Sequence, residues 1–412
     1  MKISENWLRT WVNPAIDSEK LSDQLTMLGL EVDELAPAAK PFTGVVVGEV
    51  LTVEQHPDAD RLRVTTVNIG SGEPLQIVCG APNVRAGMKA PVATIGAVLP
   101  GDFKIKKGKL RGIESQGMLC GASEIDLEDK IDGLLELPAD APVGMNIREY
   151  LDLDDNVIDI SITPNRGDCF SIRGIAREIG VINQLPVTAP EIKEVAATIS
   201  DEKKVVVSTE GCPRYLGRVI KNVNTKAVTP VWMERALARS GIRQHSILVD
   251  ITNYVLMELG QPLHAFDGGK VQGAVHVRQA TEAEKLVLLN EQEVELNEKV
   301  MVIADDEKAL AIAGIMGGLS SAVSDATTEI FLESAFFAPL HIAGRARSFG
   351  LHTDASQRYE RGVDFELPLI AMHRASQLIA ELAGGGSGTN TVPETAALLP
   401  TRDAIELNQA QV

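Results

Sequence analysis

The feature that most constrains the fold of this chain is a change of sequence pattern near residue 40. Between residues 40 and 150, short runs rich in β-branched residues alternate with turn signals that contain Gly, Pro and Asp. Such a series is typical of a small closed or sandwich-like β domain. The runs are VVVGEVLTV at 45–53, LRVTTVNI at 62–69, LQIVC at 75–79 and APVATIG at 90–96. We therefore predict a small β domain over residues 40–150, either closed as a β-barrel or sandwich-like.

Helical patterns flank this barrel on both sides. Before it, residues 18–29 carry leucines at helical spacing and end on a glycine, which suits the C-terminus of a helix. After it, Ser171 can cap a helix whose apolar residues follow the spacing of one buried face. These apolar residues are Ile172, Ile175, Ala176, Ile179 and Ile182. We predict that residues 1–39 and 151–195 form one small α/β domain, which the barrel interrupts.

Strand-like and helix-like segments mix over residues 200–395, which predicts a mixed α/β module. Within it, one strand is expected to end at Thr252 and Asn253. The Gly-rich segment 384–394 predicts a linker, and residues 396–412 are expected to begin a further domain that is truncated here. The predicted fold class is therefore α+β and multidomain: a small α/β domain interrupted by an inserted β-barrel and followed by a mixed α/β module.

Composition and length describe a soluble globular protein of several domains. The chain has 412 residues, of which 44% are hydrophobic and 23% are charged, and this composition disfavours disordered and fibrous classes. The uncharged run 309–324 is too short and too rich in Gly and Ser to span a bilayer. The N-terminus lacks the apolar segment of a secretory signal. We therefore expect a cytoplasmic protein with no membrane partner.

The cysteines give no sign of a metal site or of disulfides. No CxxC or HxxxH spacing occurs in the sequence, so neither zinc binding nor a disulfide framework is predicted. Scattered free thiols in a reducing compartment account for the cysteines, and we predict no metal site. The four are Cys79, Cys120, Cys169 and Cys212.

The net charge of −18 argues against a nucleic-acid partner, because phosphate contacts need Lys and Arg. One local patch opposes this average. In the loop 101–112 five basic residues accompany a single acid, Asp102, whereas the following stretch 123–140 is strongly acidic. A β-barrel with such a loop fits an oligonucleotide-binding fold, and an ordinary solvated hairpin is the alternative. The five basic residues are Lys104, Lys106, Lys107, Lys109 and Arg111.

A lone histidine, His264, stands in the segment MELGQPLHAFD, after an apolar stretch and a Gly-Gln-Pro corner. It is a core histidine satisfied by a neighbour, a metal ligand, or a group placed beside a substrate. The other histidines show no ligand spacing, which disfavours a metal. The first and third possibilities remain open on the residues alone.

An unusual carboxylate follows a Gly-rich segment. The segment 311–325 holds three glycines, which would let main-chain N–H groups approach a substrate. They are Gly314, Gly317 and Gly318. Glu333 then stands in an otherwise apolar strand, where a carboxylate is costly. The structural alternative is a buried glutamate paired with a nearby arginine, either Arg345 or Arg347.

Taken together and in order, many strings resemble the β subunit of bacterial phenylalanyl-tRNA synthetase. The resemblance extends over all 412 residues and covers the N-terminal half of such a subunit. The matching strings are WLRTWV, LTMLGLEVDE, HPDADRLRV, VCGAPNVRAGM, KGKLRGIESQGMLCGASEI, SITPNRGDCFSIRGIARE, VDITNYVLMELGQPLHAFD, GIMGG and LHTDASQRYERGVD.

The resemblance implies an oligonucleotide-binding barrel that contacts tRNA over residues 40–150, and an editing module over residues 200–395. The editing module of that family hydrolyses tyrosine wrongly esterified to tRNA(Phe). Glu333 would accept a hydrogen bond from the tyrosine phenol, and His264 would lie near the ester and the terminal ribose. The other residues that the resemblance places at this pocket are Thr252, Asn253, Gly314, Gly317, Gly318, Thr353 and Ala355.

A second site is useful because a pocket shaped for phenylalanine excludes tyrosine by only about 10²-fold. A site that hydrogen-bonds the phenol leaves its own polar group unpaired when phenylalanine enters, so discrimination of roughly 10⁴-fold becomes possible. No Ser, Cys or Thr stands beside an evident base, so we expect a positioned water to attack the ester. His264 would orient this water, and main-chain amides at Gly317 and Gly318 would stabilise the oxyanion.

The resemblance also implies partners that lie outside this chain. The family's β subunit continues into an aminoacylation core that pairs with the α subunit in an α2β2 heterotetramer. The complete synthetase uses ATP and Mg²⁺, whereas no cofactor is expected within this fragment. The expected partners are tRNA(Phe) and the α subunit. An alternative function is a non-catalytic tRNA-binding and assembly portion, inert without the α subunit and the rest of the β chain.

Overall fold

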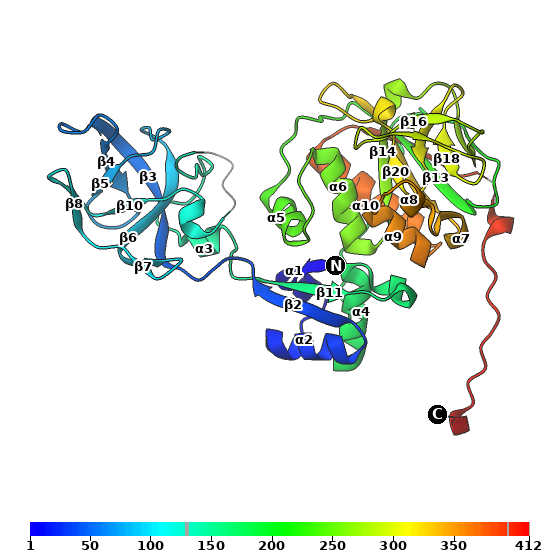
Figure 1. Cartoon of the computed structure of the whole chain (residues 1–412), viewed down its shortest axis with the longest axis horizontal. Coiled ribbons are helices and arrows are strands. Elements are labelled where there is room, and N and C mark those ends of the chain that lie inside the picture. Colours follow the sequence, from blue (N-terminus) through cyan, green and yellow to red (C-terminus); the bar gives the residue numbers. More distant parts are fainter. Residues whose placement is uncertain (128–131, 394, 412) are drawn as a thin grey trace. The chain divides into compact units, whose positions relative to one another are not determined.

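The structure is a computed structural model (Figure 1), which describes residues 1–127, 132–393 and 395–411. The chain forms two compact units. One unit consists of Met1–Leu35 together with Ile158–Val412, and the other consists of Ala36–Val157.

The unit Ala36–Val157 is built from short strands, in the region where the sequence predicts a barrel. Its elements are β3 (Thr43–Gln55), β4 (Arg63–Asn68), β5 (Leu75–Cys79), β6 (Lys89–Leu99), β7 (Phe103–Lys104), β8 (Gly108–Leu110), β9 (Ile113–Ser115), β10 (Gly117–Leu119) and α3 (Ile147–Tyr150). The sheet has the strand order β10-β6-β3-β4-β5, and β7 pairs with β6. Gln116 donates its N–H to the Gln76 carbonyl on β5 (2.8 Å), which brings the two ends of the sheet together.

Alternation along the strands explains the core of this unit. On β3, the side chains of Val45 and Val47 are buried in one hydrophobic cluster, whereas Val50 belongs to a second. β-branched side chains suit such a pleated, packed surface. Within the predicted acidic stretch 123–140, residues 128–131 lie outside the described residues.

The other unit begins with a small sheet of order β1-β11-β2, on which three helices pack. These elements are β1 (Lys2–Ser4), α1 (Glu5–Trp11), α2 (Ser18–Met27), β2 (Glu31–Pro37), β11 (Asn156–Ser161) and α4 (Ile172–Asn183). Ser171 caps α4, as predicted, by accepting a hydrogen bond from the Gly174 N–H (3.1 Å). Of the predicted apolar face, only Ile182 is exposed.

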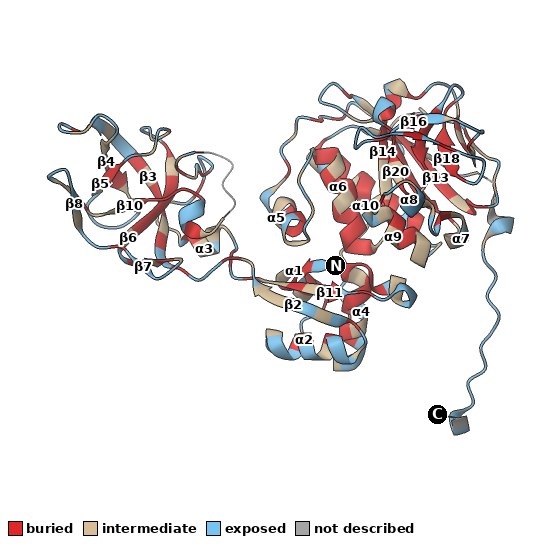
Figure 2. Cartoon of the chain, in the orientation of Figure 1, coloured by how far each residue is buried: buried red, intermediate tan, exposed pale blue. Residues whose placement is uncertain are grey.

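A second sheet, of order β14-β21-β13-β22, has two unlike faces. Helices α6 and α10, which pack against each other, cover one face (Figure 2), and the N-terminal helix α4 packs against α6. A separate hydrophobic cluster covers the other face. The elements are β13 (Arg214–Lys221), α5 (Val231–Arg239), α6 (Ile247–Leu259), β14 (Leu263–Asp267), β21 (Glu329–Phe336), α10 (Leu367–Leu382) and β22 (Gly386–Thr391).

The separate cluster contains a third sheet, of order β12-β15-β18-β19-β20, and a hairpin of β16 and β17. Its strands are β12 (Val205–Val207), β15 (Val275–Gln279), β16 (Lys285–Val287), β17 (Glu293–Glu295), β18 (Met301–Ala304), β19 (Ala309–Ile312) and β20 (Met316–Gly317). Three short helices follow β21, namely α7 (Pro339–Ile342), α8 (Arg345–Ser348) and α9 (Asp354–Arg361).

Two predictions of local structure are wrong. Thr252 and Asn253 do not end a strand, because they lie inside helix α6. The β-branched residues of this segment favour a strand locally, but the helix is buried almost all round and its packing decides the outcome. The predicted linker 384–394 contains strand β22, which pairs with β13. A Cβ at Gly388 would lie 2.1 Å from the Asp201 carbonyl oxygen, so this strand needs small residues rather than β-branched ones.

Within the described part of the chain, no helix combines the length and the apolar character needed to cross a bilayer. Residues 400–408, where a further domain is expected to begin, are exposed and form neither helix nor strand.

Candidate functional site

The pairing of β14 with β21 brings the two most unusual side chains of the sequence together. His264 is the partner of Glu333 in this antiparallel pair, and Glu333 is in turn the partner of Gly217 on β13. Because side chains alternate along strands, all three positions lie on the face that is covered by the separate cluster, away from α6 and α10.

A cavity of about 190 Å³ opens beside this pair. Its walls come from β14, the turn between β19 and β20, β21, α9 and Leu289. It is smaller than the roughly 300–1,000 Å³ of drug-sized ligand sites, so it suits one amino-acid side chain better than a nucleotide. Five of the predicted site residues line it, namely His264, Gly314, Gly317, Glu333 and Ala355.

The imidazole of His264 is a neutral group with one unused nitrogen. Burial lowers its pKa to about 4, so the ring is uncharged at pH 7. The ring of Phe266 packs edge-on against it, with centroids 4.4 Å apart. Its Nε2 is buried and has no hydrogen-bond partner among the described residues. The possibility of a core histidine satisfied by a neighbour is therefore not supported at this nitrogen.

Gly317 is a glycine because His264 lies against it. A Cβ built on Gly317 would stand 2.5 Å from Cε1 and 2.8 Å from Nε2 of the imidazole. Glycine is favoured at position 314 for a different reason, because the backbone φ there is +69°. Both positions form the wall of the cavity that faces His264 and Glu333.

Glu333 is buried, with 7% of its surface exposed, and it has no cationic partner among the described residues. The hydroxyl of Tyr215 donates a hydrogen bond to its Oε2 (2.9 Å). Burial raises the pKa of Glu333 to about 7, and the hydrogen bond from Tyr215 opposes this rise. The structural alternative, in which Arg345 or Arg347 pairs with this carboxylate, is not what the structure shows.

Thr353 and Ala355 approach the cavity from helix α9. Ala355 lines it directly. Thr353 caps α9 by accepting from the Ser356 N–H (3.0 Å), and its own hydroxyl donates to the Ile315 carbonyl (2.9 Å). Thr353 therefore ties α9 to the turn that carries Gly314, so it positions the cavity wall rather than lining it.

Three predicted residues are not brought into the cavity. The N–H of Gly318 donates to the Leu310 carbonyl (2.7 Å), which leaves it unable to stabilise an oxyanion. Thr252 and Asn253 lie on α6, which packs on the opposite face of the sheet. The hydroxyl of Thr252 donates to the Val249 carbonyl (2.8 Å) within that helix.

Sequence reasoning missed three residues around the cavity. Tyr215 holds Glu333 from the core side, and Tyr359 donates its hydroxyl to the Ala335 carbonyl (3.0 Å). Gln261 bridges to both Ala335 O (2.8 Å) and the Tyr359 hydroxyl (3.2 Å), while its Oε1 is buried without a partner among the described residues. The Gly-Gln-Pro corner of the sequence could have drawn attention to Gln261, but Tyr215 can be identified only from the register of the strands.

The basic loop of the other unit lies open to solvent. All five predicted basic residues, Lys104, Lys106, Lys107, Lys109 and Arg111, are exposed. Phe103 beside them is 58% exposed, so an aromatic face is available for stacking on a base. One charge of the loop is already neutralised, because Lys107 pairs with Glu114 (2.7 Å).

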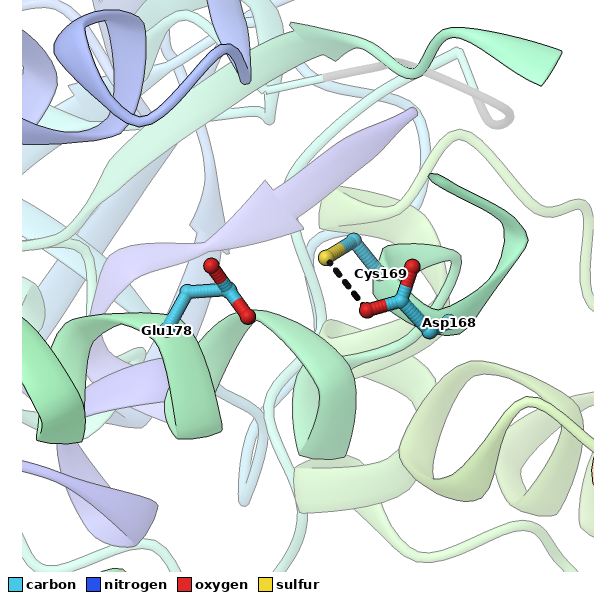
Figure 3. Close-up of side chains that lie close together, drawn as sticks. All are labelled: Asp168, Cys169 and Glu178. Atoms are coloured by element: carbon cyan, nitrogen blue, oxygen red, sulfur yellow. Dashed lines mark hydrogen bonds between the residues drawn. The ribbon is translucent and has the colours of Figure 1, made fainter. Parts of the chain in front are cut away.

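A cluster of possible metal ligands lies elsewhere, at the start of α4. Asp168, Cys169 and Glu178 bring one ligand atom each within 4.8 Å of one another (Figure 3). The guanidinium of Arg166 pairs with both Asp168 (3.1 Å) and Glu178 (3.0 Å). Burial raises the pKa of the Cys169 thiol to about 12. The cluster is therefore held by an arginine and contains a protonated thiol, which does not favour a cation.

Comparison with known proteins shows which proteins the chain resembles. Residues 45–146 match the family described as "Putative tRNA binding domain", and residues 211–384 match the B3/4 domain family. The β subunit of phenylalanine–tRNA ligase from Acinetobacter baylyi is 80% identical over 100% of this chain and 52% of that protein. Over its whole length, the chain is therefore similar to about half of a phenylalanine–tRNA ligase β subunit. The same subunit from Psychrobacter arcticus is 62% identical over 99% of this chain and 52% of its own length.

The chain thus spans about half the length of the phenylalanine–tRNA ligase β subunits that it matches. Among solved structures, an N-terminal fragment of the phenylalanyl-tRNA synthetase β subunit from Pyrococcus horikoshii is 15% identical, with a TM-score of 0.32. That match covers 58% of this chain and 67% of the fragment.

Proposed function

We propose that the cavity at His264 and Glu333 hydrolyses tyrosine wrongly esterified to tRNA(Phe), and that the unit Ala36–Val157 contributes tRNA binding. The observation that carries this proposal is Glu333 itself. It is a buried carboxylate with no cationic partner among the described residues, it faces a cavity the size of one side chain, and its pKa is about 7. A phenol that enters the cavity supplies a hydrogen-bond donor to this carboxylate.

Selectivity follows from what each substrate leaves unpaired. A hydrogen bond to a charged group contributes about 1.5–3 kcal/mol, and leaving a buried polar group unsatisfied costs about as much again. Tyrosine gains the first term, whereas phenylalanine incurs the second. The cavity therefore favours the tyrosine ester, which is the reverse of the preference of an aminoacylation pocket.

Hydrolysis itself needs a placed water rather than a strong base. With a pKa of about 4, His264 is a weak base at pH 7, so it orients the water or the ribose hydroxyl through Nε2. Water attacks the ester carbonyl, and free tyrosine and the 3′-terminal hydroxyl of the tRNA are the products. The N–H groups of Ile315 and Gly318 already donate to the Ile312 carbonyl (3.1 Å) and the Leu310 carbonyl (2.7 Å), so the candidates for stabilising the oxyanion are the amides of Gly314, Met316 and Gly317.

The remaining assignments concern the complete protein. We propose that it is a cytoplasmic α2β2 synthetase and that its α subunit, ATP and Mg²⁺ bind outside these 412 residues. Within this chain, the exposed basic loop of the unit Ala36–Val157 would contact tRNA phosphates.

One observation favours a second function. Tyr215 already satisfies one oxygen of Glu333, so this carboxylate can be a structural member of the core. The chain would then be a non-catalytic tRNA-binding and assembly portion of the β subunit.

Deacylation assays separate the two functions. Tyrosyl-tRNA(Phe) and phenylalanyl-tRNA(Phe) are incubated with the chain, with His264→Ala and with His276→Ala. The control His276 lies on β15, where it bonds to Asp306 (2.6 Å). Release of tyrosine faster than phenylalanine, lost in His264→Ala and kept in His276→Ala, supports editing. Release at the uncatalysed rate supports the assembly function instead.

A further inference from the structure

Tyr215 contacts the carboxylate of Glu333 but does not line the cavity. It lies on β13 as the partner of Ala335, two residues along β21 from Glu333, so both side chains lie on the same face of the sheet. Tyr215 is fully buried and is not among the cavity-lining residues. Its hydroxyl donates to Glu333 Oε2 at 2.9 Å, from the side of the core.

Among the neighbours of Glu333, Tyr215 makes the contact that orients its carboxylate. The position opposite Glu333 on β13 is Gly217, whose missing side chain is replaced by the ring of Phe331, 2.2 Å from a built Cβ. An apolar ring therefore fills the position opposite Glu333 on β13. Among the described residues, the hydrogen bond from Tyr215 is the one that fixes the plane of the carboxylate.

We propose that Tyr215 is a specificity-positioning residue: by holding Oε2, it presents Oε1 of Glu333 to the phenol of the substrate. The inference rests on the proposed function and adds a residue that acts through Glu333. A carboxylate has acceptor sites on both oxygens, and a fixed orientation lets the second oxygen accept without reorganisation at the moment of binding. In this arrangement, the phenol of Tyr215 orients the carboxylate of Glu333 toward the phenol of the substrate.

The charge of Glu333 depends on the same contact. The titratable groups around it are Tyr215, Tyr359, Cys212 and His264. Burial holds the pKa of each tyrosine and of the thiol well above its ordinary value, and the imidazole is neutral at pH 7. Among the described residues, no neighbouring charge therefore competes with the hydrogen bond from Tyr215, which lowers the pKa of Glu333 against the effect of burial. Without this donor the carboxyl holds its proton to higher pH and becomes a weaker acceptor.

The test compares two buried tyrosines that each bond to a glutamate. Tyr215→Phe removes the donor to Glu333, and Tyr254→Phe removes a hydroxyl that bonds to Glu258 on α6, away from the cavity. The ratio of kcat/KM for tyrosyl-tRNA(Phe) over phenylalanyl-tRNA(Phe) is measured from pH 6 to pH 9. Folding of each variant is checked by its near-ultraviolet circular dichroism.

We expect Tyr215→Phe to lower this ratio at pH 7 by about tenfold to a hundredfold, the range of a hydrogen bond to a charged group. Its selectivity should recover at higher pH, so the midpoint of the pH profile moves upward. Tyr254→Phe should keep the midpoint of the unmodified chain. A folded Tyr215→Phe variant with an unmoved midpoint overturns the role of Tyr215 alone, whereas an unmodified chain without tyrosine preference overturns the proposed function as well.

A second variant covers the case in which Tyr215→Phe fails to fold. Site-specific 3-fluorotyrosine at position 215 keeps the shape of the side chain and makes the phenol a stronger donor. The midpoint should then move downward, opposite to the effect of phenylalanine. An unchanged midpoint would contradict the proposal.

Discussion

Replacing Gly317 by alanine puts a methyl group where the imidazole of His264 lies. The built Cβ stands 2.5 Å from Cε1 and 2.8 Å from Nε2, and 3.1 Å from Cδ1 of Leu289. Real Cβ atoms do not approach so closely, so the ring must move. It cannot move far without disturbing Phe266, whose centroid is 4.4 Å away. We therefore expect the change to displace His264 while the rest of the fold persists.

The size of the stability change follows from two opposing effects. Overpacking a core position costs about 1–3 kcal/mol. Alanine restricts the unfolded chain more than glycine does, which stabilises by about 0.4–1 kcal/mol where the backbone φ is ordinary. Gly317 does not have a positive φ, so both effects apply, and the net loss should be between about 0 and 2.5 kcal/mol. The rate of tyrosine release should fall by about 10²-fold, because a small misplacement of a positioning group can cost that much in rate.

Denaturant unfolding, the NMR shift of the His264 Cε1 proton and tyrosyl-tRNA(Phe) deacylation measure these three effects. Gly269→Ala is the matched control, since its nearest neighbour, Asp267 Oδ1, would be 3.4 Å from the added methyl group. A folded Gly317→Ala variant that releases tyrosine at the normal rate, with an unmoved His264 resonance, would refute the role of Gly317 in the cavity wall.

The remaining predictions concern Glu333, the basic loop and the cap of α9. Glu333 has a pKa of about 7 in the fold, against an ordinary value of 4.5. Its contribution to the free energy of unfolding is therefore complete below pH 4.5 and is lost as the pH rises through 7. In denaturant unfolding, Glu333→Gln should be more stable than the unmodified chain by up to about 3 kcal/mol at pH 8 and by little at pH 5. Replacing Lys106 and Lys109 by alanine should weaken tRNA binding and reduce the slope of log affinity against log salt by about 0.9 for each phosphate that is no longer neutralised, whereas Lys107→Ala should do less because Lys107 is paired with Glu114. Thr353→Val should cost about 1 kcal/mol through the missing cap and slow deacylation.

Local anomalies in the sequence point to the two central residues of the candidate site, although only the family resemblance assigns them roles. His264 and Glu333 stand out because a histidine and a carboxylate are each unexpected in apolar surroundings, and the structure pairs them across two strands. The β content of residues 40–150 is equally visible, since β-branched alternation is a local pattern.

What the sequence could not supply is strand register and the competition between local preference and packing. A tyrosine at position 215 is ordinary in a strand, and only the pairing of β13 with β21 makes it the partner of Glu333. In α6, β-branched residues favour a strand, but burial on nearly every side selects a helix that ends at Gly260, where φ is +88°. The expectation that Thr252 and Asn253 lie at the pocket came from the family resemblance, whereas the structure places them on the helix that packs on the opposite face of the sheet.

The polar groups around the cavity share a shortage of partners that a ligand can fill. His264 Nε2 and Gln261 Oε1 are buried and unpaired among the described residues, and the carboxylate of Glu333 has a single donor there. Buried polar groups are normally satisfied, because each unpaired one costs about 1–3 kcal/mol. His264 and Glu333 line the cavity, whereas Gln261 does not. Under the proposed editing function, a ligand that brings hydroxyl groups to His264 and Glu333 would recover the cost at these two residues. An ester of tyrosine with a ribose carries both a phenol and a sugar hydroxyl, whereas the phenylalanine ester lacks the phenol and leaves Glu333 short. Under the proposed editing function, the same shortage that weakens the empty fold would set the preference between the two esters.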